Sequence, residues 1–406
     1  MKLVKNKNKK NFWVGFFWFL LVGALTALAV AVFIKPNFFR QKKTVAKNEY
    51  EEKAYNSINE GKFGEAEKIL KEAIEKNPQD CMAKLYLANV YLEEGYVGKN
   101  VAPDTEAALK ILSDLKEKKE CQIGRADILM GYAYELTGDW EKAQSYYDGA
   151  LSKNNNDPDA LFHKGHINWL LGDLEKAEDF YLKAEENLSA DVAWKGLKGK
   201  IFLSLGKISA VKNDDWKKTK EYFQKALEET DSKSLRAEIY YDLSTINFYN
   251  EIDLAKSLEN GLKSIENDPY NELGYVACAR EKVMEFSLIK DKSKITKEDL
   301  ESVNQYLQRA TLLNPKRALV QYWYGQFTFL IGDTKEALKR YDVALSQVEG
   351  DDSLGKIEKN FFKSEVLTAK SMVYLSLKEN KNAEKALKEA YALNPVKTSF
   401  MMEAMK

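Results

Sequence analysis

The sequence predicts an all-α protein in which an α-solenoid, a stack of paired helices, follows one transmembrane helix. Three observations support this prediction. A motif recurs at a fixed offset of 34 residues over most of the chain, as a repeat array requires. Residues 12–34 carry no charge. The 406 residues include only 7 Pro and 21 Gly, whereas 31% are charged and 45% are hydrophobic, which excludes collagen-like and disordered chains.

The uncharged stretch at 12–34 is long enough to cross a membrane as one helix. It reads FWVGFFWFLLVGALTALAVAVFI, and at about 1.5 Å per residue a helix of this length spans the roughly 30 Å hydrocarbon core. We therefore expect a basic tail at 1–11, a transmembrane helix at 12–34 and a juxtamembrane linker at 35–46. A cleaved signal peptide is the alternative, because Ala27-Leu28-Ala29 offers a small-residue site, although its apolar region would normally be shorter.

The basic residues that flank this helix favour an amino terminus inside the cell, with the rest of the chain after the helix, the body, outside it. The amino-terminal flank holds five lysines and no acidic residue, namely Lys2, Lys5, Lys7, Lys9 and Lys10. The other flank is also basic, so the positive-inside rule gives only a small preference. Seven of the 62 basic residues and none of the 62 acidic residues lie within 1–40, so the body is net acidic. An acidic body argues against binding to nucleic acid, which requires clustered Lys and Arg.

The body is one motif repeated. Gly138-Asp139-Trp140 and Gly172-Asp173-Leu174 are 34 residues apart, and their neighbours keep the same offset: Gly131 with Gly165, Ala143 with Ala177, Ala150 with Ala184, and Tyr147 with Tyr181. In these residues the chain resembles the tetratricopeptide repeat (TPR) family, whose 34-residue unit is a helix, a tight turn and a second antiparallel helix. The resemblance implies an α-solenoid wound as a right-handed superhelix, and it covers nearly everything after residue 46.

The repeat register gives about nine units within 47–397, followed by a tail at 398–406. We place the units near 47–80, 81–123, 124–157, 158–191, 192–233, 238–271, 272–317, 318–351 and 364–397. Insertions fall near Gly98, Lys207 and Ser287. The sixth unit is the weakest, because Thr245 and Ser257 stand where Gly or Ala is usual.

Two features support paired helices without the family resemblance. One position of each first helix is small, which lets two antiparallel helices approach closely; its occupants are Ala54, Ala88, Gly131, Gly165, Gly199, Thr245, Ala279, Gly325 and Ser371. The residue before proline is pushed out of helical geometry, so four second helices are expected to stop at Asn77-Pro78, Asp268-Pro269, Asn314-Pro315 and Asn394-Pro395.

The resemblance also implies a concave groove lined by first-helix side chains. The matching positions hold mainly aromatic and apolar residues: Tyr55, Leu85, Asn89, Ile128, Tyr132, Phe162, His166, Trp169, Arg280, Tyr322, Gln326 and Phe329. Such a lining suits a protein segment or peptide with hydrophobic anchors. The alternative for each of these rings is that it fills the core between neighbouring units. The carboxylate clamp of some family members is not matched, since Glu51 and Tyr55 replace its Lys and Asn.

Chemistry-bearing residues are few. Asp159, His163 and His166 could lie on one face of a helix and bind a metal, so a metal-binding enzyme is a remote alternative. The simpler interpretation is that both histidines are ordinary exposed or groove-lining residues of a repeat. Cys81, Cys121 and Cys278 form no C-x-x-C pair; a Cys81 to Cys121 disulfide is conceivable in an oxidising compartment. No P-loop, nucleophile elbow or H-E-x-x-H motif is present. We therefore expect a non-enzymatic protein without a cofactor.

These features together predict a membrane-anchored scaffold or adaptor that binds a protein partner. We expect a single-pass protein of a bacterial inner membrane, with its solenoid in the periplasm, that aids assembly of an envelope or membrane complex; the envelope role is an analogy with anchored TPR proteins. The alternative is a solenoid in the cytoplasm that acts as a regulatory or docking adaptor.

Overall fold

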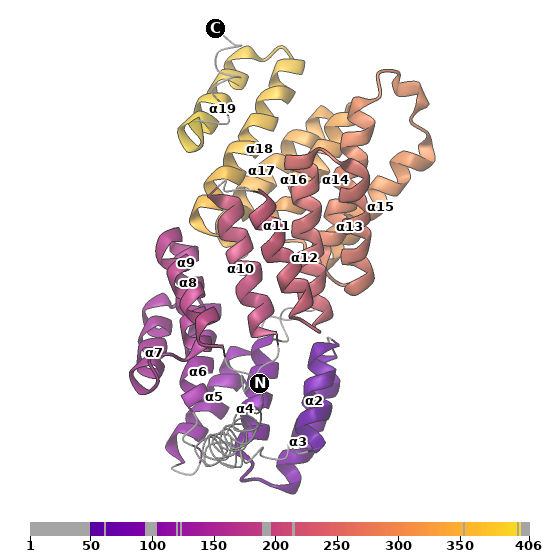
Figure 1. Cartoon of the computed structure of the whole chain (residues 1–406). Coiled ribbons are helices and arrows are strands. Elements are labelled where there is room, and N and C mark those ends of the chain that lie inside the picture. Colours follow the sequence, from indigo (N-terminus) through magenta and orange to yellow (C-terminus); the bar gives the residue numbers. More distant parts are fainter. Residues whose placement is uncertain are drawn as a thin grey trace, which may run out of the picture. The chain divides into compact units, whose positions relative to one another are not determined.

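The computed structural model describes residues 49–60, 62–93, 104–118, 121, 124–188, 196–212, 216–351, 354–395 and 398. These residues form eighteen α-helices and no β-strand (Figure 1). Within this described part, none of the helices combines the length and the apolar character that crossing a membrane requires. The transmembrane helix predicted at 12–34 lies outside the described residues.

The helices alternate between first and second members of consecutive pairs. The first helices are α2 (Glu49–Asn59), α4 (Cys81–Glu93), α6 (Gly124–Leu136), α8 (Pro158–Leu171), α10 (Leu197–Val211), α12 (Lys233–Ile246), α14 (Glu272–Leu288), α16 (Ala318–Leu330) and α18 (Lys356–Ser376). The second helices are α3 (Phe63–Lys76), α5 (Thr105–Glu117), α7 (Trp140–Lys153), α9 (Leu174–Glu186), α11 (Trp216–Glu228), α13 (Leu254–Asn267), α15 (Lys297–Leu313), α17 (Thr334–Gln347) and α19 (Asn380–Leu393). Residues 50–406 belong to one compact unit.

Consecutive helices pack in antiparallel pairs, from α4 with α5 to α18 with α19. In the third pair, Lys153 at the end of α7 donates to Asp127 near the start of α6 over 2.6 Å. In the first pair, Lys76 at the end of α3 contacts Tyr50 at the start of α2. Each such contact joins the start of one helix to the end of the next, as an α-hairpin requires.

Small residues set the distance between paired helices. A Cβ atom added to Gly131, Gly165 or Gly325 would lie only 2.5–2.7 Å from the ring of the tyrosine on the second helix, so the backbone and the ring are already in contact. The three rings belong to Tyr147, Tyr181 and Tyr341, which are fully or almost fully buried. The close approach expected at these positions is therefore present.

The tight turns within the third, fourth, sixth and eighth pairs use a left-handed residue followed by a capping aspartate. Gly172 has φ of 86°, and the side chain of Asp173 accepts a hydrogen bond from the Lys176 backbone N–H at the start of α9. Gly138 and Gly332 have the same conformation, which glycine adopts without a steric penalty. Ile252 and Lys378 take this left-handed conformation in the sixth and ninth pairs.

The Asn-Pro and Asp-Pro signals end helices as predicted. Helices α3, α13, α15 and α19 end at Lys76, Asn267, Leu313 and Leu393, each directly before the expected stop. The capping residue, for example Asn77 or Asn314, no longer has helical backbone angles. Its backbone N–H donates to a carbonyl group in the last turn of the helix.

Three first helices, α10, α14 and α18, are longer than the repeat requires. Near Lys207, helix α10 continues to Val211, and near Ser287, helix α14 continues to Leu288 before the short 3-10 helix η4 (Lys292–Lys294). Helix α18 begins at Lys356, eight residues before the expected start of the ninth unit at 364. The insertion near Gly98 lies outside the described residues.

Replacing Gly165 by Ala should lower the free energy of unfolding by about 1–3 kcal/mol, because the new methyl group must displace the buried Tyr181 ring. Gly149→Ala is the matched control, since Gly149 is also within a helix and an added Cβ there meets nothing within 4 Å. Urea unfolding followed by circular dichroism measures both. Equal effects of the two substitutions would contradict the close approach.

Candidate functional site

The first helices of successive units form a continuous layer. Contacts run from α4 to α6 and α8, and onward through α10, α12, α14 and α16 to α18 (Figure 1). Because each first helix from α4 to α16 touches the first helix of the next unit, side chains from distant parts of the sequence share one surface. We call this surface the first-helix layer.

Of the twelve residues predicted to line a groove, half are buried and half are partly exposed. The buried residues are Tyr55, Leu85, Ile128, Trp169, Arg280 and Tyr322. The partly exposed residues are Asn89, Tyr132, Phe162, His166, Gln326 and Phe329. A partner that binds the layer as it stands can contact the second group, whereas the first group packs within the protein.

Arg280 explains the unusual sixth unit. Its guanidinium is 1% exposed, donates to Ser244 Oγ at 2.7 Å and to Thr245 Oγ1 at 3.0 Å, and pairs with Glu281 at 3.0 Å. It also lies 4.6 Å from the centroid of the Phe248 ring. The hydroxyl groups that weaken the repeat pattern here therefore provide acceptors for a buried arginine, which would otherwise carry a large desolvation cost. Sequence periodicity placed Arg280 in a groove because it cannot distinguish an inward-facing position from a buried one.

The two histidines converge on one carboxylate. The side chains of His163 and His166 both contact Glu135 through Nδ1, at 3.3 and 2.6 Å, and Tyr147 donates its hydroxyl to the same carboxylate at 2.7 Å. Burial would raise the pKa of Glu135, but the neighbouring His166 and His163 hold that pKa well below its ordinary value. The carboxylate therefore stays ionised and orients both rings.

Asp159, the third residue of the conceivable metal set, does not join the histidines. Its carboxylate forms an ion pair with Arg125 of α6. No group of three or more His, Cys, Asp or Glu suited to a metal ion is found among the described residues. The two imidazoles instead stack on aromatic rings, His163 against Tyr147 and His166 against Trp169.

A second charged cluster lies where α10, α12 and α18 meet. Lys207 pairs with Glu238 at 2.5 Å and lies 3.9 Å from Asp242, and Glu358 of α18 also interacts with it. Burial raises the pKa of Asp242 to about 7, against the attraction of Lys207, and burial likewise raises the pKa of Glu358 to about 7. One ammonium group is thus shared by three carboxyl groups, of which Asp242 and Glu358 gain their negative charge only as the pH rises through about 7. Above that pH the cluster favours the approach of a second cation and disfavours phosphate.

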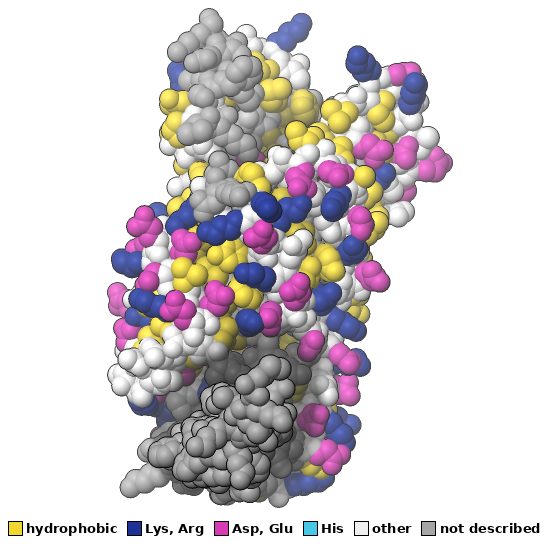
Figure 2. All heavy atoms as spheres, viewed as in Figure 1, with side chains coloured by type: hydrophobic (Ala, Val, Ile, Leu, Met, Phe, Trp, Pro, Cys, Tyr) yellow, Lys and Arg dark blue, Asp and Glu magenta, His cyan; other side chains and the backbone are white. Residues whose placement is uncertain are grey.

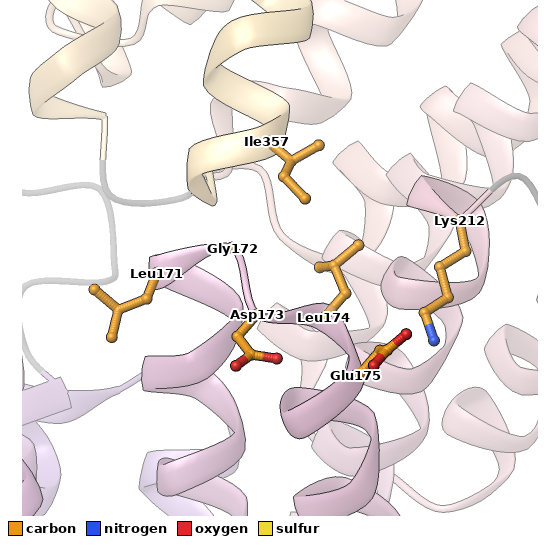
Figure 3. Close-up of a pocket in the computed structure, with 7 residues that line it drawn as sticks. All are labelled: Leu171, Gly172, Asp173, Leu174, Glu175, Lys212 and Ile357. Carbon is orange, nitrogen blue, oxygen red and sulfur yellow. The ribbon is translucent and has the colours of Figure 1, made fainter.

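Helices α8 and α18 touch, although some 185 residues separate them in the sequence. Beside this contact is a cavity of about 550 Å³, lined by Leu171, Gly172, Asp173, Leu174, Glu175, Lys212 and Ile357. Figure 3 shows Ile357 of α18 facing the turn between α8 and α9. Lys212, the residue after α10, also lines the cavity, and its ammonium group pairs with Glu178. The cavity is open, so an apolar side chain of a partner could enter it.

A disulfide joins Cys81 to Cys121, which brings the start of α4 close to the segment after α5. The two Cα atoms are 5.6 Å apart, within the usual range for a disulfide. The bond closes the part of the chain that includes the insertion near Gly98. Cys278 is buried and unpaired.

Two family models match this chain. Both describe a tetratricopeptide repeat; one matches residues 128–192 and the other residues 364–397. The chain therefore contains tetratricopeptide repeats at residues 128–192 and 364–397. The family models match the third and fourth pairs, α6 to α9, and the ninth pair of α18 and α19.

Solved structures share the TPR fold at low sequence identity. The human IFIT1 dimer with m7Gppp-AAAA is 14% identical, with a TM-score of 0.56 over 88% of this chain and 80% of that one. The same dimer with PPP-AAAA is 14% identical, with a TM-score of 0.53 over 87% and 78%. Yeast Tom70 is 16% identical, with a TM-score of 0.39 over 88% of each chain. No curated protein matches the sequence. The IFIT1 likeness shows a common fold alone.

The raised carboxyl pKa values predict that this TPR array loses stability as pH rises. A carboxyl group with a folded pKa of about 7 and an unfolded pKa near 4 stabilises the fold fully at low pH, and the contribution is lost between about pH 4 and 7. Asp242→Asn should therefore match the wild type at or below about pH 4 and exceed its free energy of unfolding by about 1–2 kcal/mol at pH 8.

Urea unfolding at several pH values tests this prediction. Asp114→Asn serves as the control, because Asp114 is an exposed carboxylate whose ammonium partner, Lys118, is 3.7 Å away. Parallel stability curves for the wild type and Asp242→Asn would contradict the raised pKa.

Proposed function

We propose that this protein is a non-enzymatic, membrane-anchored scaffold that binds a segment of a partner protein on its first-helix layer. The observation that carries the proposal is the continuity of this layer, which brings partly exposed aromatic and polar side chains onto one surface. Aromatic rings such as Tyr132, Phe162 and Phe329 provide large contact areas at low entropic cost, so they suit apolar anchors of a peptide or helix.

Charge indicates which partner the layer suits. Glu238, Asp242 and Glu358 surround Lys207, so a basic side chain of a partner would be attracted and a phosphate repelled. On the face drawn in Figure 2, basic and acidic side chains are interspersed. Although IFIT1 was solved with m7Gppp-AAAA, these charges support a protein partner here and disfavour nucleic acid.

The disulfide supports a location outside the cytoplasm. Disulfides persist in oxidising compartments such as the bacterial periplasm and are rare in the reducing cytosol. Combined with the membrane helix expected at 12–34, the Cys81–Cys121 bond favours an inner-membrane protein whose solenoid lies in the periplasm and aids assembly of an envelope complex. A cytoplasmic solenoid would keep these thiols reduced.

Location is tested by protease digestion of a carboxyl-terminal tag in intact bacterial spheroplasts, together with thiol counting in acid-quenched, denatured cells. We expect digestion without lysis, and one reactive thiol per chain before reduction and three after, because only Cys278 is unpaired. Cys278→Ser, the control, should give no thiol before reduction. Protection of the tag until lysis, with three free thiols, would place the solenoid in the cytoplasm.

Partner binding is tested by placing a photocrosslinking amino acid at Phe329, which is partly exposed on α16. We expect a discrete protein adduct from living cells. The control is the same amino acid at Leu312, which is 67% exposed on the second helix α15 and lies off the first-helix layer. Identical adducts at both positions, or crosslinks to nucleic acid at Phe329, would contradict a protein-binding layer.

A further inference from the structure

The first two turns of α18 are additional to the repeat. Helix α18 has 21 residues, whereas the first helices α8 and α16 have 14 and 13. The repeat register begins the ninth unit at 364, so residues 356–363 are an extension that the unit does not need. We call residues 355–363 the α18 extension.

The α18 extension lies against the end of α8. A Cβ atom added to Gly355 would lie 2.9 Å from the carbonyl oxygen of Trp169 and 3.2 Å from its ring, so backbone and indole are in direct contact. A Cβ atom added to Gly172 would meet Ile357 at 3.6 Å. Figure 3 shows Ile357 above the α8–α9 turn, next to the open cavity.

The α18 extension covers two of the residues predicted to line a groove. Trp169 is 6% exposed beside Gly355, and Tyr322 is 8% exposed with its ring packed edge-on against Phe362 at 5.6 Å. The α18 extension therefore contacts both α8 and α16, as a bound helix would. The neighbouring Phe361 remains 41% exposed.

The charge of the α18 extension suits its position poorly. Glu358 interacts with Lys207 of α10, which already pairs with Glu238 and lies near Asp242 of α12, and burial disfavours the charged form of Glu358. Asp351, which also acts on Glu358, is itself paired with Arg317 at 2.7 Å. The Gly355 backbone N–H donates to Glu358 at 2.8 Å and gives partial compensation. An uncharged or basic side chain at the position of Glu358 would fit these surroundings better.

We propose that the α18 extension is a built-in ligand that covers the first-helix layer between α8 and α16, and that the partner is a helical segment that displaces it. The favoured partner segment carries apolar side chains at the spacing of Ile357 and Phe362, with an uncharged or basic residue at the position of Glu358. This inference rests on the proposed protein-binding function for the identity of the competitor. Docking of the α18 extension itself does not depend on that function.

Docking is tested by hydrogen exchange on the full chain. Gly355→Ser adds a Cβ atom that must push against Trp169, while serine remains a good helix cap. We expect amides of residues 357–363 to exchange at least about tenfold faster than in the wild type, whereas amides of 366–376 are unchanged. Gly350→Ser is the matched control, because an added Cβ there meets nothing within 4 Å. Should Gly355→Ser lose helicity, Ile357→Asn tests the same contact from the other side.

Displacement is tested with a fluorescent peptide of residues 354–366 that carries Glu358→Gln. It should bind Gly355→Ser at least about tenfold more tightly than the wild type, and more tightly than the peptide of native sequence. Unchanged exchange in the variants, or no peptide binding to them, would overturn the proposal. If these experiments fail while the Phe329 photocrosslinker still captures a protein, the built-in ligand is refuted and the protein-binding function stands. Failure of the crosslink alone refutes the function and leaves the docked α18 extension.

Discussion

Several helix pairs depend on a close contact in which a small residue of the first helix meets a side chain of the second. In the third, fourth and eighth pairs this contact joins a glycine to a buried tyrosine ring, as between Gly165 and Tyr181. Because each pair is held at a fixed distance, successive pairs stack in the same way and their first helices come into contact. The shared surface of the first helices, and hence any site on it, follows from this constraint.

Polar groups on that surface distinguish this array from a plain stack of repeats. Arg280 is buried among hydroxyl groups of the sixth pair, and Glu135 orients His163 and His166. Around Lys207 the carboxyl groups outnumber the ammonium group, which leaves a preference for cations on a surface otherwise suited to apolar anchors. We therefore propose that this surface recognises a protein through its aromatic rings and through the carboxyl groups around Lys207.

Local signals in the sequence predicted the helices well, because glycine turns, Asn-Pro stops and the 34-residue period act over short distances. The candidate site was predicted only in part. Periodicity identifies Trp169 and Tyr322 as inward-facing, but it cannot show that α18 starts early and covers them. The contact between α8 and α18 joins residues about 185 positions apart, and no repeat pattern encodes such a pairing. Arg280 was likewise predicted to line the groove, but it is buried because it donates to Thr245 of α12 and Ser257 of α13.

The most direct test of this account is a distance measurement across the contact between α8 and α18. Spin labels at the exposed positions Glu175 and Lys356, in a chain with Cys278→Ser, report this distance by electron paramagnetic resonance. The account predicts one narrow, short distribution in the free protein, and a second, longer distribution after addition of the peptide of residues 354–366 carrying Glu358→Gln. A distribution that is broad in the free protein, or that the peptide leaves unchanged, would contradict a first-helix layer closed by its own α18 extension.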